Sequence, residues 1–252
     1  MRNTTIEISS FVYGLSNKER LKLTEQIINE SSADILLFSG HTIGFVNDIE
    51  ILKNSITNKS TEVILELEDI NSSKINNCLY RIEKGILTSL FTNQQFINSR
   101  EIENNYQLAE RFLHELETKR VLLINDLKVL IIQCGELNIL RNFQTENNRV
   151  EFRLFDDKIL KTRFRKIIKE SNIILNPIHT PMGNQGKMNM RRIFLSKNKR
   201  YYFSASNTKE NSDNLDLKSM QYAFYNGKPL TIKDVNYNKN SITRSFEIKN
   251  IC

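Results

Sequence analysis

The sequence contains no apolar run that approaches the roughly 20 residues needed to cross a bilayer. Its first ten residues, MRNTTIEISS, also lack the apolar stretch of a signal peptide. The three cysteines, Cys78, Cys134 and Cys252, are odd in number and have no CxxC spacing, so they suggest neither a disulfide framework nor a zinc site. We therefore expect a cytoplasmic protein with no membrane segment, in which any functional thiol acts alone.

Several other site motifs are missing. The sequence has no Gly-rich phosphate loop, no metal-spaced cluster of His and Cys, and no Gly-x-Ser-x-Gly elbow. We accordingly expect no metal and no cofactor. The formal net charge of +7 favours an acidic partner such as nucleic acid, although coding bias towards Asn, Ile and Lys also explains it. Nucleic-acid binding is therefore kept as a minor alternative.

The composition that is present favours a folded α/β domain. Hydrophobic residues make up 39% and charged residues 26% of the 252 residues, which is enough apolar surface for a sizeable core. No linker interrupts the pattern, so we expect one domain over 1–252, with a polar surface loop at 207–216. Apolar runs and period-2 alternation predict strands over 5–11, 33–38, 62–67, 78–82, 86–91, 121–124, 129–132, 173–175, 201–205, 221–225 and 242–248.

Helices are predicted between these strands. Ser16 and Glu19 have capping-box spacing and should begin the first helix. Further helical periodicity covers 49–56, 108–116, 158–169 and 188–195, and the helix over 158–169 should place its apolar side chains on one face. Glu83-Lys84-Gly85 and Asn226-Gly227 have the turn chemistry of β-hairpins.

Cys134 is the best single clue to function. The segment 128–136 reads KVLIIQCGE, in which an apolar strand delivers a cysteine, a glycine that allows a sharp turn, and a carboxylate. A thiol attacks as thiolate, so a nucleophilic Cys134 needs positive charge, a helix N-terminus or a base beside it. A lone cysteine after an apolar strand is also commonly a packing residue, and both interpretations stay open here.

The order of segments resembles the nitrilase, or carbon–nitrogen hydrolase, superfamily over roughly residues 4–250. The strand ADILLF at 33–38 is similar to the strand before that family's catalytic glutamate, and 128–136 is similar to its nucleophile strand. The rest of the resemblance lies in Ile174 to Pro177, Thr180-Pro181, the Arg191-Arg192 helix and Tyr202 to Asn207. The resemblance implies a four-layer αββα sandwich, a homodimer, and a Glu, Lys, Cys triad that acts on a small amide or nitrile.

This sequence departs from the family triad at two positions. Phe38-Ser39-Gly40-His41 places Gly40 where the family glutamate is expected, so we expect no carboxylate at this corner. The stretch 91–96 reads FTNQQF and offers neutral amides where the lysine is expected. Only Cys134 matches. A general base contributes about 10²- to 10⁴-fold in rate and an oxyanion donor on the order of 3 to 4 kcal/mol, so the loss of both weakens the family chemistry severely.

A replacement base is available in principle. His41 follows the lost glutamate, and its imidazole could serve Cys134 with Glu136 orienting it. In the alternative interpretation, His41 is a polar loop residue and Glu136 caps a helix or pairs with Arg191 or Arg192. His179 and His114 need no function, the first on a loop that faces the site by analogy and the second within a helix.

Two functions therefore remain open for a protein with this predicted fold. It is either a thiol-dependent hydrolase of carbon–nitrogen bonds, with Cys134, Glu136 and His41 as its candidate catalytic residues, or a non-catalytic binding or assembly module. In the first case Cys134 forms an acyl or thioimidate intermediate.

Overall fold

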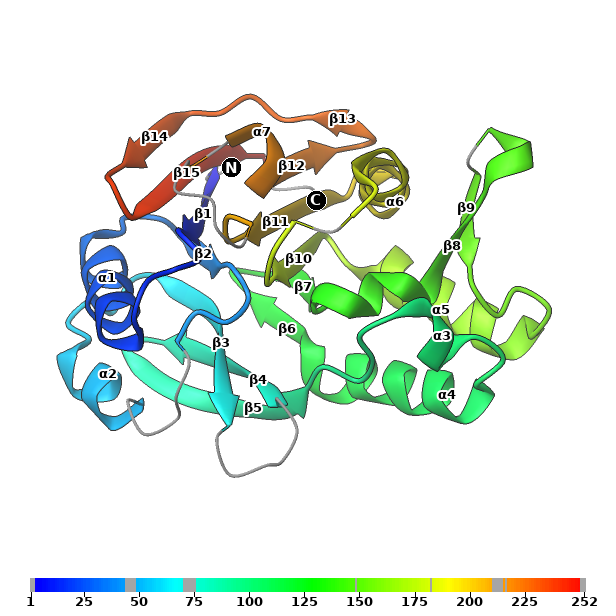
Figure 1. Ribbon diagram of the computed structural model, residues 1–252, viewed down its shortest axis with the longest axis horizontal. Coiled ribbons are helices and arrows are strands. Elements are labelled where there is room, and N and C mark those ends of the chain that lie inside the picture. The colour runs from blue at the N-terminus through cyan, green and yellow to red at the C-terminus, as the bar shows by residue number, and fades with distance from the viewer. Residues whose placement is uncertain are drawn as a thin grey trace.

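Two β-sheets packed face to face form the middle of the computed structural model, which describes residues 3–43, 49–69, 76–147, 149–181, 183–209, 215 and 217–249 (Figure 1). The first sheet has the strand order β14-β15-β1-β2-β3-β4-β5. Its strands are β1 (Thr4–Phe11), β2 (Ile35–Phe38), β3 (Glu62–Asp69), β4 (Asn76–Glu83), β5 (Ile86–Asn93), β14 (Asp234–Tyr237) and β15 (Ser241–Ile248). Strands β1, β2 and β3 run parallel, so their carboxyl ends share one edge.

The second sheet has the order β13-β12-β11-β10-β7-β6. Its strands are β6 (Val121–Ile124), β7 (Leu127–Ile131), β10 (Ile173–Ile178), β11 (Tyr201–Ser206), β12 (Gln221–Tyr225) and β13 (Lys228–Pro229). Strands β7, β10 and β11 are parallel. Both predicted hairpins are confirmed: Gly85 and Gly227 have φ of 78° and 79°, between β4 and β5 and between β12 and β13 respectively.

The period-2 pattern of the strands divides their apolar side chains between two layers. In β2, Ile35 and Leu37 point between the sheets, whereas Leu36 and Phe38 face the helices outside. In β10 and β11, Leu175 and Phe203 lie between the sheets in the same way. The short continuous apolar runs of the sequence are therefore strands buried on both faces.

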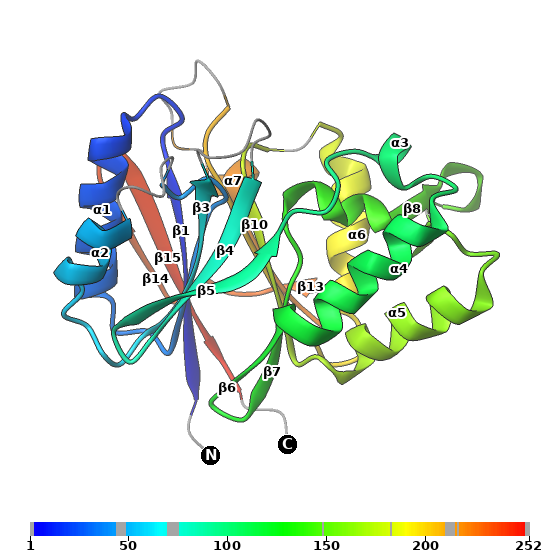
Figure 2. The same cartoon turned by 90° about the horizontal axis from the view of Figure 1, so that it is seen from below.

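Helices cover the outer face of each sheet (Figure 2). Helices α1 (Asn17–Glu30) and α2 (Ile49–Ser55) pack on the first sheet. The second is covered by α4 (Tyr106–Glu115), α5 (Lys158–Glu170) and α6 (Gln185–Ser196). This arrangement confirms the predicted α/β fold, a four-layer αββα sandwich. The remaining short helices are α3 (Ser99–Ile102) and α7 (Leu217–Met220).

Local signals in the sequence place the helices correctly. Ser16 and Glu19 form the predicted capping box, since the Glu19 N–H donates to the Ser16 hydroxyl and the Glu19 carboxylate accepts from the Ser16 N–H. In α5, Leu160, Phe164 and Ile167 are buried on one face, as predicted. None of the helices in the described part of the chain combines the length and apolar surface that crossing a bilayer requires.

Some elements were not predicted. A separate hairpin of β8 (Leu140–Phe143) and β9 (Arg149–Phe152) follows a 3₁₀ helix, η3 (Cys134–Ile139), and a π-helical segment, η2 (Leu116–Arg120), extends α4. Another 3₁₀ turn, η4 (Gln144–Glu146), joins β8 to β9. Most of the loop predicted at 207–216 lies outside the described residues, as does Cys252, but Asn207 and Thr208 at its start are buried.

Candidate active site

The parallel strands of the two sheets end at a shared corner of the molecule, and Asn207 links them there. Its Oδ1 accepts hydrogen bonds from the Phe11 N–H at 3.3 Å and from the Ser39 hydroxyl at 2.6 Å. Its Nδ2 donates to the Gly40 carbonyl at 2.8 Å. The Gly40 N–H in turn donates to the carbonyl of Ile178 at the end of β10. One buried amide thus fixes the first sheet against the second at this corner.

Cys134 lies at this corner, just past the end of β7, as the first residue of η3. The next residue is Gly135, and at this position the chain passes very close to the loop after β5. A Cβ atom on Gly135 would lie 2.3 Å from the carbonyl oxygen of Ile97 and 2.7 Å from the side-chain nitrogen of Gln94. The glycine that the sequence places after Cys134 is therefore required by this close approach.

The surroundings of the thiol keep it protonated. Burial, together with the carboxylates of Glu66 and Glu136, raises the pKa of Cys134 to about 12. A hydrogen bond from the backbone N–H of His179 acts in the opposite direction but is outweighed. A nucleophilic Cys134 would therefore need a base that removes its proton during the attack, rather than a thiolate that exists at rest.

A buried carboxylate, Glu66, stands in the same cluster. Its Oε2 is 2.8 Å from Nε2 of His179 and accepts the backbone N–H of His41 at 3.2 Å. Its Oε1 accepts the side-chain amide of Gln133 at 2.8 Å. Burial alone would raise the pKa of Glu66, but the charge and hydrogen bond of His179 and the Gln133 amide lower it below its ordinary value. Glu66 is therefore a carboxylate at neutral pH.

The expectation that Gly40 leaves this corner without a carboxylate is wrong. Glu66 comes from the adjacent strand β3, and a Cβ atom on Gly40 would lie only 2.9 Å from its Oε2. The sequence did contain a signal for it. In the alternating strand at 62–67, Glu66 has the phase of Ile64, which lies between the sheets, and an acid on a buried face needs a partner.

His41 lies beside His179, with 3.8 Å between the ring centroids and an edge-to-face arrangement. Its backbone has φ of 51°, and its carbonyl accepts a hydrogen bond from the Arg20 guanidinium. Burial, His179 and Arg20 together lower the pKa of His41 to about 4, and Glu66 opposes them only in part. His41 therefore belongs to the cluster, but its imidazole is neutral at neutral pH.

Glu136 is held by groups away from His41. Its carboxylate accepts hydrogen bonds from the N–H groups of Gln95 and Gln133, at 2.8 and 2.9 Å. It also forms a fully buried ion pair with Arg120, at 2.5 Å. The capping role proposed for Glu136 is confirmed, whereas its expected partners were wrong. Arg191 instead binds the Asn142 side chain and Arg192 the Gln185 side chain.

The stretch 91–96, where the family resemblance implies a lysine, brings neutral groups to the site. The side chain of Gln94 lies beside Gly135, and its Nε2 donates to the Phe96 carbonyl. Thr92 and Asn93 are tied to Arg120 through a hydroxyl and a carbonyl oxygen. The guanidinium of Arg120 is thus committed to Glu136 and to this loop.

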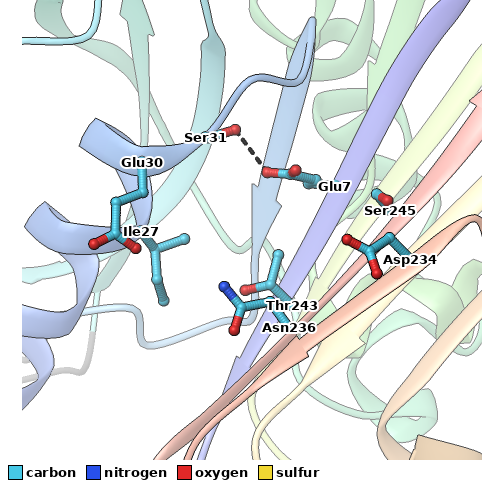
Figure 3. A pocket seen from close by; sticks show the side chains of 8 residues that line it. All are labelled: Glu7, Ile27, Glu30, Ser31, Asp234, Asn236, Thr243 and Ser245. Carbon is cyan, nitrogen blue, oxygen red and sulfur yellow. Dashed lines mark hydrogen bonds between the residues drawn. The ribbon is translucent and has the colours of Figure 1, made fainter.

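A hollow of about 70 Å³ lies away from Cys134, between the end of α1 and strands β1, β14 and β15 (Figure 3). It contains the carboxylates of Glu7, Glu30 and Asp234, and Glu7 accepts a hydrogen bond from the Ser31 hydroxyl at 2.6 Å. No thiol or imidazole belongs to its lining. Within the described ranges, no group of three or more His, Cys, Asp or Glu side chains is arranged to hold a metal ion.

Solved structures with this architecture are numerous, although no protein-family model and no curated protein sequence matches the chain. A carbon–nitrogen hydrolase superfamily protein from Xanthomonas campestris has 10% sequence identity and a TM-score of 0.58, over 99% of this chain and 91% of the other. The chain has the carbon–nitrogen hydrolase fold. At such identities, the likeness establishes the fold alone.

Two further structures with the carbon–nitrogen hydrolase fold align over nearly the whole chain. An amidase from Nesterenkonia sp. AN1, in a mutant form, has 10% identity and a TM-score of 0.59, over 97% of this chain and 90% of the other. In that structure the acetamide moiety of fluoroacetamide is covalently added to the active-site cysteine. Nit3 of Saccharomyces cerevisiae, a nitrilase superfamily member, has 10% identity, a TM-score of 0.54 and the same coverage.

Proposed function

We propose that the protein is a thiol-dependent hydrolase that cleaves a carbon–nitrogen bond of a small amide or nitrile through Cys134. The observation that carries this proposal is the convergence of three chemically different groups at one corner of the carbon–nitrogen hydrolase fold. The imidazole of His179 meets the Glu66 carboxylate at 2.8 Å, and the His179 backbone N–H faces the Cys134 thiol. Thiol, acid and imidazole together are the groups that nucleophilic catalysis requires.

In the proposed reaction with an amide, the Cys134 sulfur attacks the carbonyl carbon while a base takes the thiol proton. The C–S bond forms as the carbonyl π electrons move to oxygen. Collapse of this tetrahedral intermediate breaks the C–N bond, and the departing nitrogen takes up the proton. Water then attacks the thioester, releases the carboxylic acid and returns a proton to sulfur. A nitrile would pass through a thioimidate at the same cysteine.

The proposal is tested by incubating the full chain with a panel of small amides and nitriles and measuring ammonia release. Intact-protein mass spectrometry would reveal an acyl adduct, with fluoroacetamide as a covalent probe. We expect turnover and adduct in the wild type and in Cys78→Ser, and neither in Cys134→Ala. Cys78 is the matched control because it too is a partly buried cysteine. Ammonia release that survives in Cys134→Ala would refute the role of this thiol.

One observation favours a second function, that of a non-catalytic binding or assembly module. The pKa of Cys134 is raised to about 12, and the neighbouring loop offers the Gln94 amide in place of a cation. This function predicts no ammonia and no Cys134 adduct across the whole panel. Nucleic-acid binding, in contrast, predicts affinity for a duplex that falls steeply with added salt.

We further propose that the substrate is a small amide or nitrile, that the protein forms a homodimer, and that it works in the cytoplasm. Sedimentation of the purified chain tests the dimer, since a monomer at micromolar concentration would contradict it.

A further inference from the structure

We propose that His179 is the general base for Cys134 and that Glu66 is the positioning residue that orients it. This inference rests on the proposed hydrolase function and specifies how that site replaces the missing glutamate and lysine. Its basis is geometric: the buried carboxylate of Glu66 meets the ring of His179 through one oxygen and the side chain of Gln133, the residue before the thiol, through the other.

The orientation of the His179 ring leaves one nitrogen for the thiol. Nε2 is 2.8 Å from Glu66 Oε2, and the Cδ2 edge faces Gly40, where a Cβ atom would lie 2.3 Å away. Nδ1 is therefore on the opposite edge of the ring. It is also the ring nitrogen closer to the main chain, whose N–H donates to the Cys134 sulfur. Among the hydrogen bonds of the described residues, none involves Nδ1.

The carboxylate fixes the tautomer that this role requires. An ionised Glu66 accepts a hydrogen bond, so Nε2 carries the proton and Nδ1 is left as the acceptor. The other oxygen of Glu66 accepts the amide of Gln133, the residue before the nucleophile. Base and nucleophile are therefore positioned by the same buried carboxylate, and a carboxylate–imidazole–nucleophile arrangement of this type is a recurrent catalytic solution.

The groups that face His179 come from three other elements. Glu66 lies on β3, Cys134 begins η3, and His41 follows β2 with the Arg20 guanidinium on its carbonyl. His41 shares the cluster, but its hydrogen bond to Glu66 is made by its backbone N–H, and no carboxylate of the described residues is hydrogen-bonded to its ring. His41 therefore packs against the base and does not replace it.

The proton balance is complete with these groups. As the C–S bond forms, the proton of Cys134 moves to Nδ1 of His179, whose imidazolium is stabilised by Glu66. The same proton passes to the leaving nitrogen as the C–N bond breaks. Water then gives a proton to Nδ1 while its oxygen attacks the thioester, and that proton returns to sulfur when the C–S bond breaks. No oxidant, metal or second substrate besides water is required.

The test compares His179→Ala and Glu66→Gln with a matched control, His114→Ala on the exposed surface of α4. His41→Gln, at the other histidine of the cluster, tests the rival assignment of the base. The pH dependence of kcat/KM is measured for each, together with the rate of Cys134 modification by fluoroacetamide, which requires no turnover. We expect His179→Ala to lose about 10²- to 10⁴-fold and the acidic limb of its pH profile. Added imidazole should restore part of the rate. Glu66→Gln should lower kcat with little change in KM. His114→Ala should keep the wild-type profile, and His41→Gln should keep its acidic limb.

The two proposals fail in different ways. Suppose that Cys134→Ser abolishes hydrolysis while His179→Ala and Glu66→Gln stay within about threefold of the wild-type rate. The proposed roles of His179 and Glu66 are then refuted, and the proposed hydrolase function is retained. The same holds if His41→Gln, rather than His179→Ala, removes the acidic limb. If the wild type neither hydrolyses the panel nor reacts with fluoroacetamide at Cys134, both proposals are refuted. Circular dichroism identifies misfolded variants. If His179→Ala misfolds, the rescue of His179→Gly by added imidazole tests the role of His179 in its place. Glu66→Gln is the conservative variant that tests Glu66.

Discussion

The carboxylate of Glu66 occupies the space that a side chain at Gly40 would need. A Cβ atom there would lie 2.9 Å from Glu66 Oε2 and 2.3 Å from Cδ2 of His179. The absence of a side chain at Gly40, just after β2, and the presence of the acid on β3 are thus one geometric relationship.

This relationship predicts that Gly40→Ala displaces the His179 ring from Glu66. Overpacking of a tight site costs about 1–3 kcal/mol, so we expect a lower free energy of unfolding and a larger loss of hydrolytic rate. The change should cost much less in a His179→Ala background, because the ring that it meets is gone. Urea denaturation of the four proteins in this cycle measures the coupling.

Gly14→Ala is the matched control for that cycle, since no atom lies within 4 Å of its added Cβ. It should shift the free energy of unfolding by less than about 0.5 kcal/mol. Additive effects of Gly40→Ala and His179→Ala would contradict the proposed crowding.

The fold could be predicted from the sequence because its signals are local. Apolar runs of four to six residues, the Ser16 capping box and the Asn226-Gly227 turn each specify an element without reference to distant residues. The hairpin of β8 and β9 was missed because its strands are short and it stands apart from both sheets, where no apolar alternation is required.

The site was predicted in part. Cys134 could be located because it directly follows an apolar strand, but the partner of Glu136 could not. Arg120 lies in a π-helical segment 16 residues earlier, and nothing in its local pattern marks it as buried. The pattern does not predict Glu66 as a site residue, because an acid in an alternating strand is usually on the exposed face. Only its alternation in register with Ile64 indicates that Glu66 is buried.

The buried pair of Arg120 and Glu136 predicts a structural role for Glu136. Arg120→Met leaves a carboxylate buried without its counter-charge, so we expect a loss of about 3–5 kcal/mol in the free energy of unfolding. Lys53→Met removes one partner of the exposed pair with Glu50 and should cost less than about 1 kcal/mol. Urea denaturation at neutral pH compares the two.

The same pair separates structure from catalysis. Glu136→Gln should lower the fraction of folded protein, while the rate per folded molecule stays close to that of the wild type. A variant that remains fully folded and yet loses its hydrolytic rate would instead make Glu136 a catalytic residue, as the sequence suggested.

His41 predicts a loss of stability in mild acid. Its pKa is lowered to about 4 in the folded protein from an ordinary value of 6.5. Between these values the unfolded chain binds a proton that the folded chain does not, so the free energy of unfolding falls as the pH falls through this window. His41→Gln should remove part of this dependence, whereas His114→Gln on the exposed surface should leave it intact. Urea midpoints between pH 7 and 4 give the comparison, and equal slopes in all three proteins would contradict the assignment.

The thiol of Cys134 predicts the opposite behaviour in alkali. Its pKa is raised to about 12 from an ordinary value of 9.0. Above pH 9 the unfolded chain loses a proton that the folded chain retains, so the free energy of unfolding should fall as the pH rises towards 12. Cys134→Ser removes this contribution and should flatten the alkaline slope. In a Cys78→Ser, Cys252→Ser background, thiolate absorbance would follow Cys134 alone. A thiolate that forms below pH 9 in the folded protein would show that the site stabilises the anion at rest, and the attack would then need no base.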